Sequence, residues 1–357
     1  MPVRYKIDYV NRFAGILLGT AVGDAIGLPM EGISPRRIKR LRKGELGHHL
    51  FFRRGMISDD TEHALMVAQA LVQHNDDADA FARSLGWKFR FWFLAFPAGL
   101  GMATLRSCIK LWLGFSPKRS GVFSAGNGPA MRSAIIGAYF HDDRALMEKM
   151  VRVSTMISHT DPKAQVGALA VALAAAWATE HGEAGDRMEA AALLTAIPGA
   201  DENWLSLAGK IQKALSDNVS VSEFARDLGL AKGVTGYMYH TVPVALYAWL
   251  CHYGDFPATL QAVVECGGDT DTVGAIACAV AGATVGKDGI PKKWIEGIVD
   301  WPRSKSVLHA VSEQLARRKI GEPATPVRYF RPAVPVRNLV FFVIVLLHGF
   351  RRLLPPY

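Results

Sequence analysis

Gly267-Gly268-Asp269-Thr270-Asp271-Thr272 stands directly before residues 273–285, an uncharged apolar segment. Much earlier in the chain, Ser58-Asp59-Asp60-Thr61 precedes a second apolar, Ala-rich run at 64–72. Small and capping residues followed by strong helix formers predict that each stretch opens a helix. Both helices are too apolar to be exposed, so we expect the two acidic starts at the edge of one core.

The two stretches together predict a split metal site. Carboxylates gathered at the edge of a core repel one another unless cations or protons accompany them. Oxygen ligands without His or Cys favour Mg²⁺ or Mn²⁺ over zinc. Each stretch alone could be an ordinary helix N-cap, because Asp and Ser accept free backbone N–H groups. Two alternating acids and two threonines in 269–272 exceed what one cap can use.

Composition indicates a folded protein of a reducing compartment. The chain has 357 residues, enough for one large core or two modest ones. Half the residues are apolar and a fifth are charged, which excludes disorder. The four cysteines form no CxxC pair, and residues 1–10 contain no apolar signal segment. We therefore expect a cytoplasmic protein with buried thiols, with peripheral association at the inner face of the membrane as the alternative.

Positive charge is concentrated at the C-terminal end. From Arg317 onward eight Lys and Arg residues face one acid, Glu322, so this segment carries +7 of the net +9. The rest of the chain is nearly neutral, and global nucleic-acid affinity is not implied. A second basic run, 36–43, predicts a solvated helix face, with an anionic partner surface as the alternative.

The chain reads as all-α, because no run alternates with period two strongly enough to predict a sheet. Four prolines make 321–338 an expected extended linker. The apolar segment 339–350 follows, with Arg337 before it and two arginines after it. Twelve helical residues span about 18 Å, short of a membrane core of about 30 Å. Docking to a membrane surface or to a protein is therefore expected of this tail, with packing on the body as the alternative. Helices are also expected at 12–26, 79–96, 236–252, 256–265 and 304–318.

Two glycine-rich turns are candidates for binding a phosphate or a sugar. Gly99 and Gly101 precede a helical segment and could let backbone N–H groups approach an anion, although an ordinary helix start has the same pattern. Gly126-Asn127-Gly128 precedes a proline and adds a side-chain amide to a bare backbone. His159, in Ser158-His159-Thr160-Asp161, is either a ligand contact or a satisfied core histidine.

These residues give the sequence a resemblance to the ADP-ribosylglycohydrolase family. The resemblance runs from about Arg12 to Trp301. It rests on four short patterns in order: Gly23-Asp24 with Glu31, Ser58-Asp59-Asp60-Thr61, Gly126-Asn127-Gly128 and Gly268-Asp269-Thr270-Asp271-Thr272. It implies a compact orthogonal helical bundle with a central dinuclear Mg²⁺ or Mn²⁺ site in a domain of residues 1–320. The linker 321–338 and the tail 339–357 lie outside it.

The resemblance also implies roles for individual residues. The implied metal ligands are Ser58, Asp59, Asp60, Asp269, Asp271 and Thr272. Ser58 stands where the family more often has Thr, and either hydroxyl can coordinate. Glu31 and Asp60 are the implied catalytic carboxylates. The residues implied to contact ADP-ribose are Gly99, Gly101, Gly126, Asn127, Gly128 and His159.

The function implied is hydrolysis of the C1″ glycosidic bond that joins ADP-ribose to an acceptor. A protein acceptor is expected first, with nucleic acid or a small metabolite as alternatives. Two other functions remain open: an ADP-ribose-binding regulator without turnover, and a metal-dependent hydrolase of another nucleotide-derived substrate. The intact acidic residues argue against the first, and the second gives no use to Gly126-Asn127-Gly128.

Overall fold

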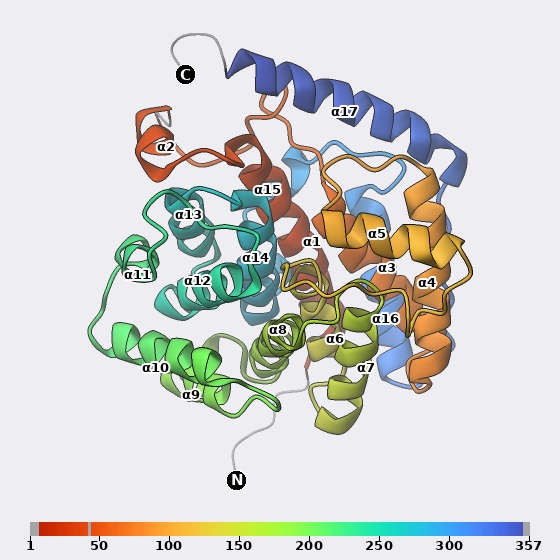
Figure 1. The fold of residues 1–357 in the computed structure, drawn as a ribbon, viewed down its shortest axis with the longest axis horizontal. Helices are drawn as coiled ribbons and strands as arrows, with labels where there is room; N and C mark the ends of the chain where they lie inside the picture. The colour runs from red at the N-terminus through yellow and green to blue at the C-terminus, as the bar shows by residue number, and fades with distance from the viewer. Residues whose placement is uncertain (1–6, 42–43, 353–357) are drawn as a thin grey trace.

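The computed structural model of the chain describes residues 7–41 and 44–352. Over these residues the backbone forms α-helices and short 3-10 turns, with isolated bridges and no strands. The all-α prediction is therefore confirmed. Figure 1 shows the helices packed at many angles around a buried centre, with α17 (Val334–Arg351) lying across the outside of the bundle.

Two apolar helices, α1 (Tyr9–Gly27) and α14 (Thr270–Val285), pack against each other in the core. Every fourth residue of α1 from Gly15 to Gly27 is a glycine. A Cβ atom at any of these four positions would come within 2.2–2.3 Å of a carbonyl oxygen of α14. The backbones of α1 and α14 are therefore in direct contact, and any residue larger than glycine at these four positions would force them apart. This contact brings the C-terminal end of α1 beside the N-terminal end of α14.

The other helices surround this pair. The helices predicted from sequence coincide within a few residues with α1, α4 (Ala78–Leu94), α12 (Met238–Cys251), α13 (Phe256–Cys266) and α16 (Lys305–Lys319). The surrounding helices are α2 (Pro35–Leu41), α3 (Asp59–Gln73), α4 (Ala78–Leu94), α5 (Met102–Trp112), α6 (Ala134–Tyr139), α7 (Arg144–Met156), α8 (Pro162–His181), α9 (Arg187–Ala192), α10 (Glu202–Ser216), α11 (Val221–Asp227), α12 (Met238–Cys251), α13 (Phe256–Cys266), α15 (Lys292–Gly297) and α16 (Lys305–Lys319). The 3-10 turns are η1 (Leu28–Met30), η2 (Ala130–Arg132), η3 (Gly182–Ala184), η4 (Leu193–Thr195), η5 (Lys287–Gly289) and η6 (Arg331–Ala333).

The four cysteines are free, and three of them are buried, in agreement with the sequence. The C-terminal segment differs from the expectation. The final helix, α17 (Val334–Arg351), begins inside the stretch predicted as an extended linker. Pro335 lies in its first turn, where a missing N–H costs no hydrogen bond.

The sequence argument that the apolar tail is too short to span a membrane is also wrong. Residues Arg331–Arg351 form a helical stretch long and apolar enough to cross a membrane by length and composition, and 28% of its most apolar window is buried. The region Tyr9–Met30 passes the same test, but it is 94% buried because it contains the core helix α1.

Candidate active site

The first acidic stretch begins α3 and is fastened to α1 by Asp24. Ser58 is the N-cap of α3, and its hydroxyl accepts the backbone N–H of Asp60. Asp24 Oδ2 accepts the backbone N–H of Ser58 at 2.8 Å and the hydroxyl of Thr61. Asp24 is fully buried. The core helix therefore fixes the orientation of the residues that follow Ser58.

Asp60 joins the two acidic stretches. Its Oδ2 atom accepts the hydroxyl of Ser58 at 3.2 Å and the hydroxyl of Thr272, from α14, also at 3.2 Å. Its Oδ1 atom is buried and has no hydrogen-bond partner, and the same is true of Asp271 Oδ1. Two buried carboxylate oxygens at the meeting point of two helix starts thus lack a donor, which a folded protein rarely tolerates.

The second stretch depends on glycine. Gly268 has a φ of +82°, and a Cβ there would lie 2.0 Å from the carbonyl oxygen of Val234. Backbone bonds at Gly268 fasten the neighbouring Glu31 loop: the N–H of Gly32 donates to Gly268 at 2.7 Å, and Gly268 donates to Ile33 at 2.9 Å. Asp269 is the N-cap of α14, yet its side chain caps no backbone N–H. The simple capping interpretation therefore fails for this stretch.

Burial and mutual repulsion disfavour the charged forms of these acids. Burial, then Asp59 and Asp24, hold the pKa of Asp60 well above its usual value. Burial, then Glu31 and Asp269, do the same for the pKa of Asp271. Burial also raises the pKa of Asp24 to about 6. The pKa of Glu31 is raised by burial and then by Asp269, but Glu31 lies at the exposed edge, where water screens much of the repulsion.

The donor set fits a hard divalent cation, although the side chains do not form a preformed metal centre. Within 7–41 and 44–352, no three His, Cys, Asp or Glu side chains converge closely enough to hold an ion as they stand. The predicted ligand set, however, includes two hydroxyls, and it contains the unpartnered oxygens of Asp60 and Asp271. Carboxylate and hydroxyl oxygens are the ligands that Mg²⁺ and Mn²⁺ prefer.

The Gly126-Asn127-Gly128 turn is attached to the acidic stretch. Asn127 Nδ2 donates to Asp269 Oδ2 at 2.6 Å and to the hydroxyl of Thr241 at 3.0 Å. Its backbone N–H donates to Gly236 at 3.0 Å. The family resemblance implies that Asn127 contacts ADP-ribose, and the structure links Asn127 directly to a predicted metal ligand.

His159 lies against the same turn. A Cβ on Gly126 would come 3.0 Å from His159 Nε2, and a Cβ on Gly128 would come 3.2 Å from Cε1. Burial, and then Arg132, lower the pKa of His159 to about 3, so the ring is neutral at physiological pH. Gly126 and Gly128 therefore lie directly against the imidazole of His159 and form one surface with it.

Sequence reasoning missed Arg132, which supports this surface from beneath. Its guanidinium is fully buried and donates to Ser158 Oγ at 2.7 Å and to the carbonyl of Gly128 at 2.9 Å. Ser158 Oγ in turn lies 2.8 Å from His159 Nδ1. Burial lowers the pKa of Arg132 to about 9, which leaves it charged at neutral pH. A lone arginine after a glycine turn carries no sequence signal for this role.

The other predicted turn is only partly brought to the site. A Cβ on Gly99 would lie 3.8 Å from Asp59 Oδ1, which places Gly99 at the edge of the acidic cluster. Gly101 is the N-cap of α5. Nothing beyond its chain neighbours lies within 4 Å of its Cβ position, so the structure does not bring Gly101 against the other predicted residues.

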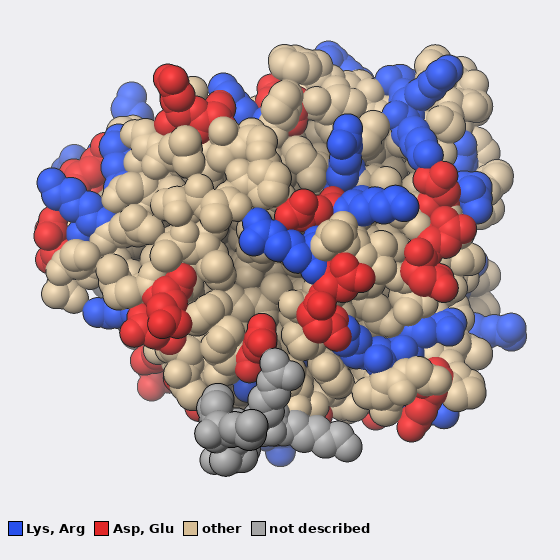
Figure 2. All heavy atoms as spheres, turned by 90° about the horizontal axis from the view of Figure 1, so that it is seen from below, with Lys and Arg blue, Asp and Glu red and all other residues tan. Residues whose placement is uncertain are grey.

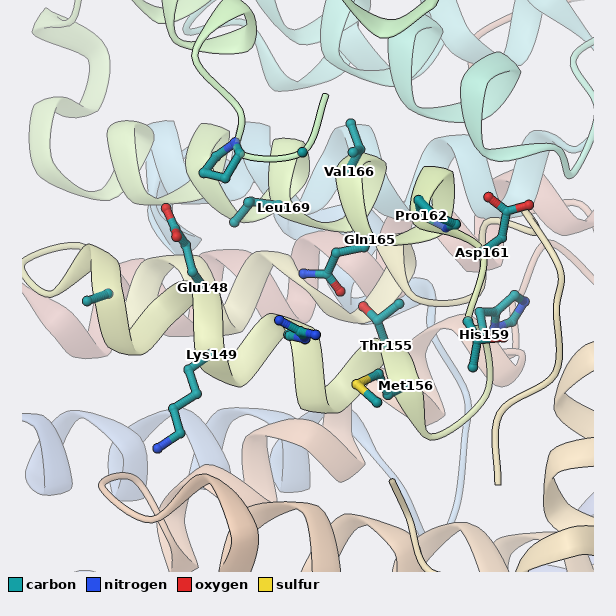
Figure 3. A pocket seen from close by; sticks show the side chains of 15 residues that line it. Glu148, Lys149, Thr155, Met156, His159, Asp161, Pro162, Gln165, Val166 and Leu169 are labelled. Atoms are coloured by element: carbon teal, nitrogen blue, oxygen red, sulfur yellow. The ribbon is translucent and has the colours of Figure 1, made fainter. Parts of the chain in front are cut away.

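A cavity beside His159 is separate from the acidic cluster. A cavity of about 680 Å³ opens between α7 and α8 and is lined by residues such as Glu148, Thr155, Gln165 and His159. Figure 3 shows His159 at one end of this cavity, near Asp161, with Glu148 and Lys149 toward the other end. None of the predicted metal ligands lines it. The predicted metal ligands therefore belong to a separate set of polar contacts at the starts of α3 and α14.

The structure has the helical bundle, with acids clustered where α1, α3 and α14 meet, that the resemblance to the ADP-ribosylglycohydrolase family predicts. The comparisons with known proteins agree with that family. The model of the ADP-ribosylglycohydrolase family matches residues 6–324. The chain belongs to the ADP-ribosylglycohydrolase family.

Individual relatives cover most of the chain. An uncharacterized protein of Archaeoglobus fulgidus is 32% identical over 297 residues, covering 81% of this chain and 92% of that protein. The ADP-ribosyl-[dinitrogen reductase] glycohydrolase of Rhodospirillum rubrum is 28% identical over 318 residues, covering 86% and 96%. A solved ADP-ribosylglycohydrolase-related protein complex contains a chain with the same fold, at a TM-score of 0.66 and 24% identity, covering 87% of this chain and 99% of that one. Residues after 324, including α17, lie outside the family match.

Proposed function

We propose that this protein is a divalent-metal-dependent hydrolase that releases ADP-ribose from an acceptor. The observation that carries the proposal is the pair of unpartnered buried oxygens on Asp60 and Asp271; Asp60 also accepts the hydroxyl of Thr272, the residue that follows Asp271. Family membership supports the reaction class. The R. rubrum relative is named an ADP-ribosyl-[dinitrogen reductase] glycohydrolase, which supports the same reaction class.

The residues that would hold the cations are Ser58, Asp59, Asp60, Asp269, Asp271 and Thr272. Bound there, Mg²⁺ or Mn²⁺ would lower the pKa of a water and orient the ribose hydroxyls. The rest of the chemistry belongs to the side chains. Asp24 holds Ser58 and Thr61 in place, and Asn127 holds Asp269.

Glu31 is our candidate for proton transfer. It lies at the exposed edge of the cluster, where solvent can exchange protons with it, and burial and then Asp269 raise its pKa above the usual value of a glutamate. As a carboxylate it would take the proton of the attacking water, and as an acid it would protonate the leaving group. Asp60 is the alternative. Neutral His159 and the bare backbone at Gly126 and Gly128 would bind the rest of ADP-ribose without introducing charge.

The test is release of ADP-ribose from arginine-, serine- and guanine-linked substrates, with Mg²⁺ or with EDTA. We expect metal-dependent release from one linkage, lost in Asp60→Asn. The matched control is Asp255→Asn, because Asp255 is an exposed N-cap of α13 and Asn caps a helix equally well. Binding of ADP-ribose without release from any linkage would overturn the proposal in favour of a regulator without turnover.

A further inference from the structure

The outer face of α17 is apolar along the whole helix. At the helical repeat of 100° per residue, its exposed side chains fall on one side. Leu339 is 64% exposed, Leu347 61% and Phe350 62%. The other exposed apolar side chains of this face are Val336, Val340, Phe342, Val343 and Leu346. A helix that faced only water would carry polar residues at these positions.

The inner face holds the helix flat against the body at both ends. Near its start, Arg337 donates to the carbonyl of Ile57 and pairs with Asp300 and Glu62. At its end, His348 lies 3.2 Å from the carbonyl of Pro29, and Arg352 donates to the carbonyl of Glu31 at 2.8 Å. Crossing a membrane would place Arg337 and Asn338 in hydrocarbon and strip the buried acids of a partner. The helix is therefore held parallel to the surface of the body.

Basic residues flank the apolar face, and acids are absent from its segment. Arg328 and Arg331 precede α17, and no Asp or Glu occurs after Glu322. At the far end, α2 lies beside the helix terminus, where Arg37 donates to the carbonyl of Arg352 at 2.9 Å. The α2 side chains Arg36, Lys39 and Arg40 add positive charge there. Figure 2 shows a different face of the molecule, where acidic and basic side chains are interspersed.

We propose that the outer face of α17 docks on an anionic lipid surface. A helix with an exposed apolar face and basic ends lies in the plane of a membrane interface, with its cations at the head groups. Pairing of α17 with a second copy is the competing occupant of this face. An antiparallel pair would bring the basic end of one helix beside the basic end of the other, which disfavours it.

Two exposed loops extend the docking surface. Leu50 and Ala98 pack with Phe341 of α17. Phe52 and Phe96, two residues from these contacts, are 84% and 81% exposed. Aromatic rings presented beside an amphipathic helix are suited to the boundary between head groups and acyl chains.

The experiment is flotation of the full chain with vesicles of phosphatidylcholine alone and of phosphatidylcholine mixed with phosphatidylglycerol. We expect binding to the anionic vesicles that weakens in high salt. The test variant is Leu339→Glu with Leu347→Glu, two exposed residues of the outer face that make none of the contacts between α17 and the body described above. Its binding should fall about tenfold or more, since charge is excluded from the apolar boundary.

The matched control is Met188→Glu with Leu205→Glu, two exposed apolar residues in α9 and α10, far from α17 (Figure 1). We expect the control to bind as the wild type does, and both variants to keep the wild-type melting temperature. Absence of wild-type binding to anionic vesicles would overturn the proposal, as would equal binding by the α17 variant. A wild-type dimer that the α17 variant dissociates, without vesicle binding, would assign the face to a second copy and also overturn it.

Discussion

Gly23 of α1 lies so close to Gly274 of α14 that a Cβ on Gly23 would be 2.2 Å from the Gly274 carbonyl oxygen. The next residue along α1 is Asp24, which fixes the start of α3, and Asp271 lies in the first turn of α14. The glycine contact therefore sets the spacing of the candidate site as well as that of the core.

Gly23→Ala should separate α1 from α14, because the new methyl group meets backbone that cannot move aside. We expect a loss of about 1–3 kcal/mol in the free energy of unfolding, measured by denaturant titration, and a loss of ADP-ribose release. Gly209→Ala is the control, since Gly209 lies in α10 with open space around it. That change should be neutral or stabilising by about 0.5–1 kcal/mol. Equal stability of the two variants would contradict the close packing.

Asp60→Asn should raise the melting temperature of the metal-free protein. The substitution removes one of several acids whose charged forms burial and repulsion disfavour, while the amide oxygen can still accept from Ser58 and Thr272. In EDTA we expect a rise of about 2 °C or more by calorimetry. Mg²⁺ should stabilise the wild type and have little effect on the variant. An equal Mg²⁺ response in both proteins would remove Asp60 from the ligand set.

Glu31→Gln should lower kcat by about 10²-fold or more and leave KM nearly unchanged, because the change removes a proton-transfer group and keeps the shape of the side chain. The pH–rate profile of the wild type should contain a limb from Glu31 above the usual pKa of a glutamate. That limb should disappear in the variant. Its survival would assign proton transfer to Asp60 or another acid.

His159 makes the fold sensitive to acid. The folded-state pKa of His159 is about 3, whereas an unfolded histidine titrates near about 6.5. Its contribution to stability is therefore complete above pH about 6.5 and is lost as pH falls below it, at about 1.4 kcal/mol per pH unit. His159→Gln should lose less stability than the wild type between pH 7 and pH 5, measured by urea unfolding. Parallel losses in the two proteins would contradict a neutral buried imidazole.

Arg337→Met should destabilise the protein by about 3–5 kcal/mol, because it leaves Asp300 without its buried partner. It also frees the carbonyl of Ile57, next to Ser58, so ADP-ribose release should fall. Arg328→Ala, an exposed arginine outside α17, is the control and should change stability by less than about 0.5 kcal/mol. A stable, active Arg337→Met protein would show that α17 does not support the site.

The sequence alone determined the helices and the acidic starts of α3 and α14. Caps, turn residues and apolar runs act within a few residues of one another, so they can be read from the chain directly. The family resemblance also assigned Asn127 and His159 to the predicted ADP-ribose site. The four-residue spacing of glycines from Gly15 to Gly27 is a further readable signal, and it identifies the face of α1 that touches α14.

Only the tertiary structure decided which distant residues meet. The pairing of Asn127 with Asp269, the support of His159 by Arg132, and the anchoring of α17 by Arg337 join segments far apart in sequence. No local pattern encodes such contacts, because each depends on how several helices pack together. The same packing buries one face of the apolar C-terminal segment and leaves the other exposed.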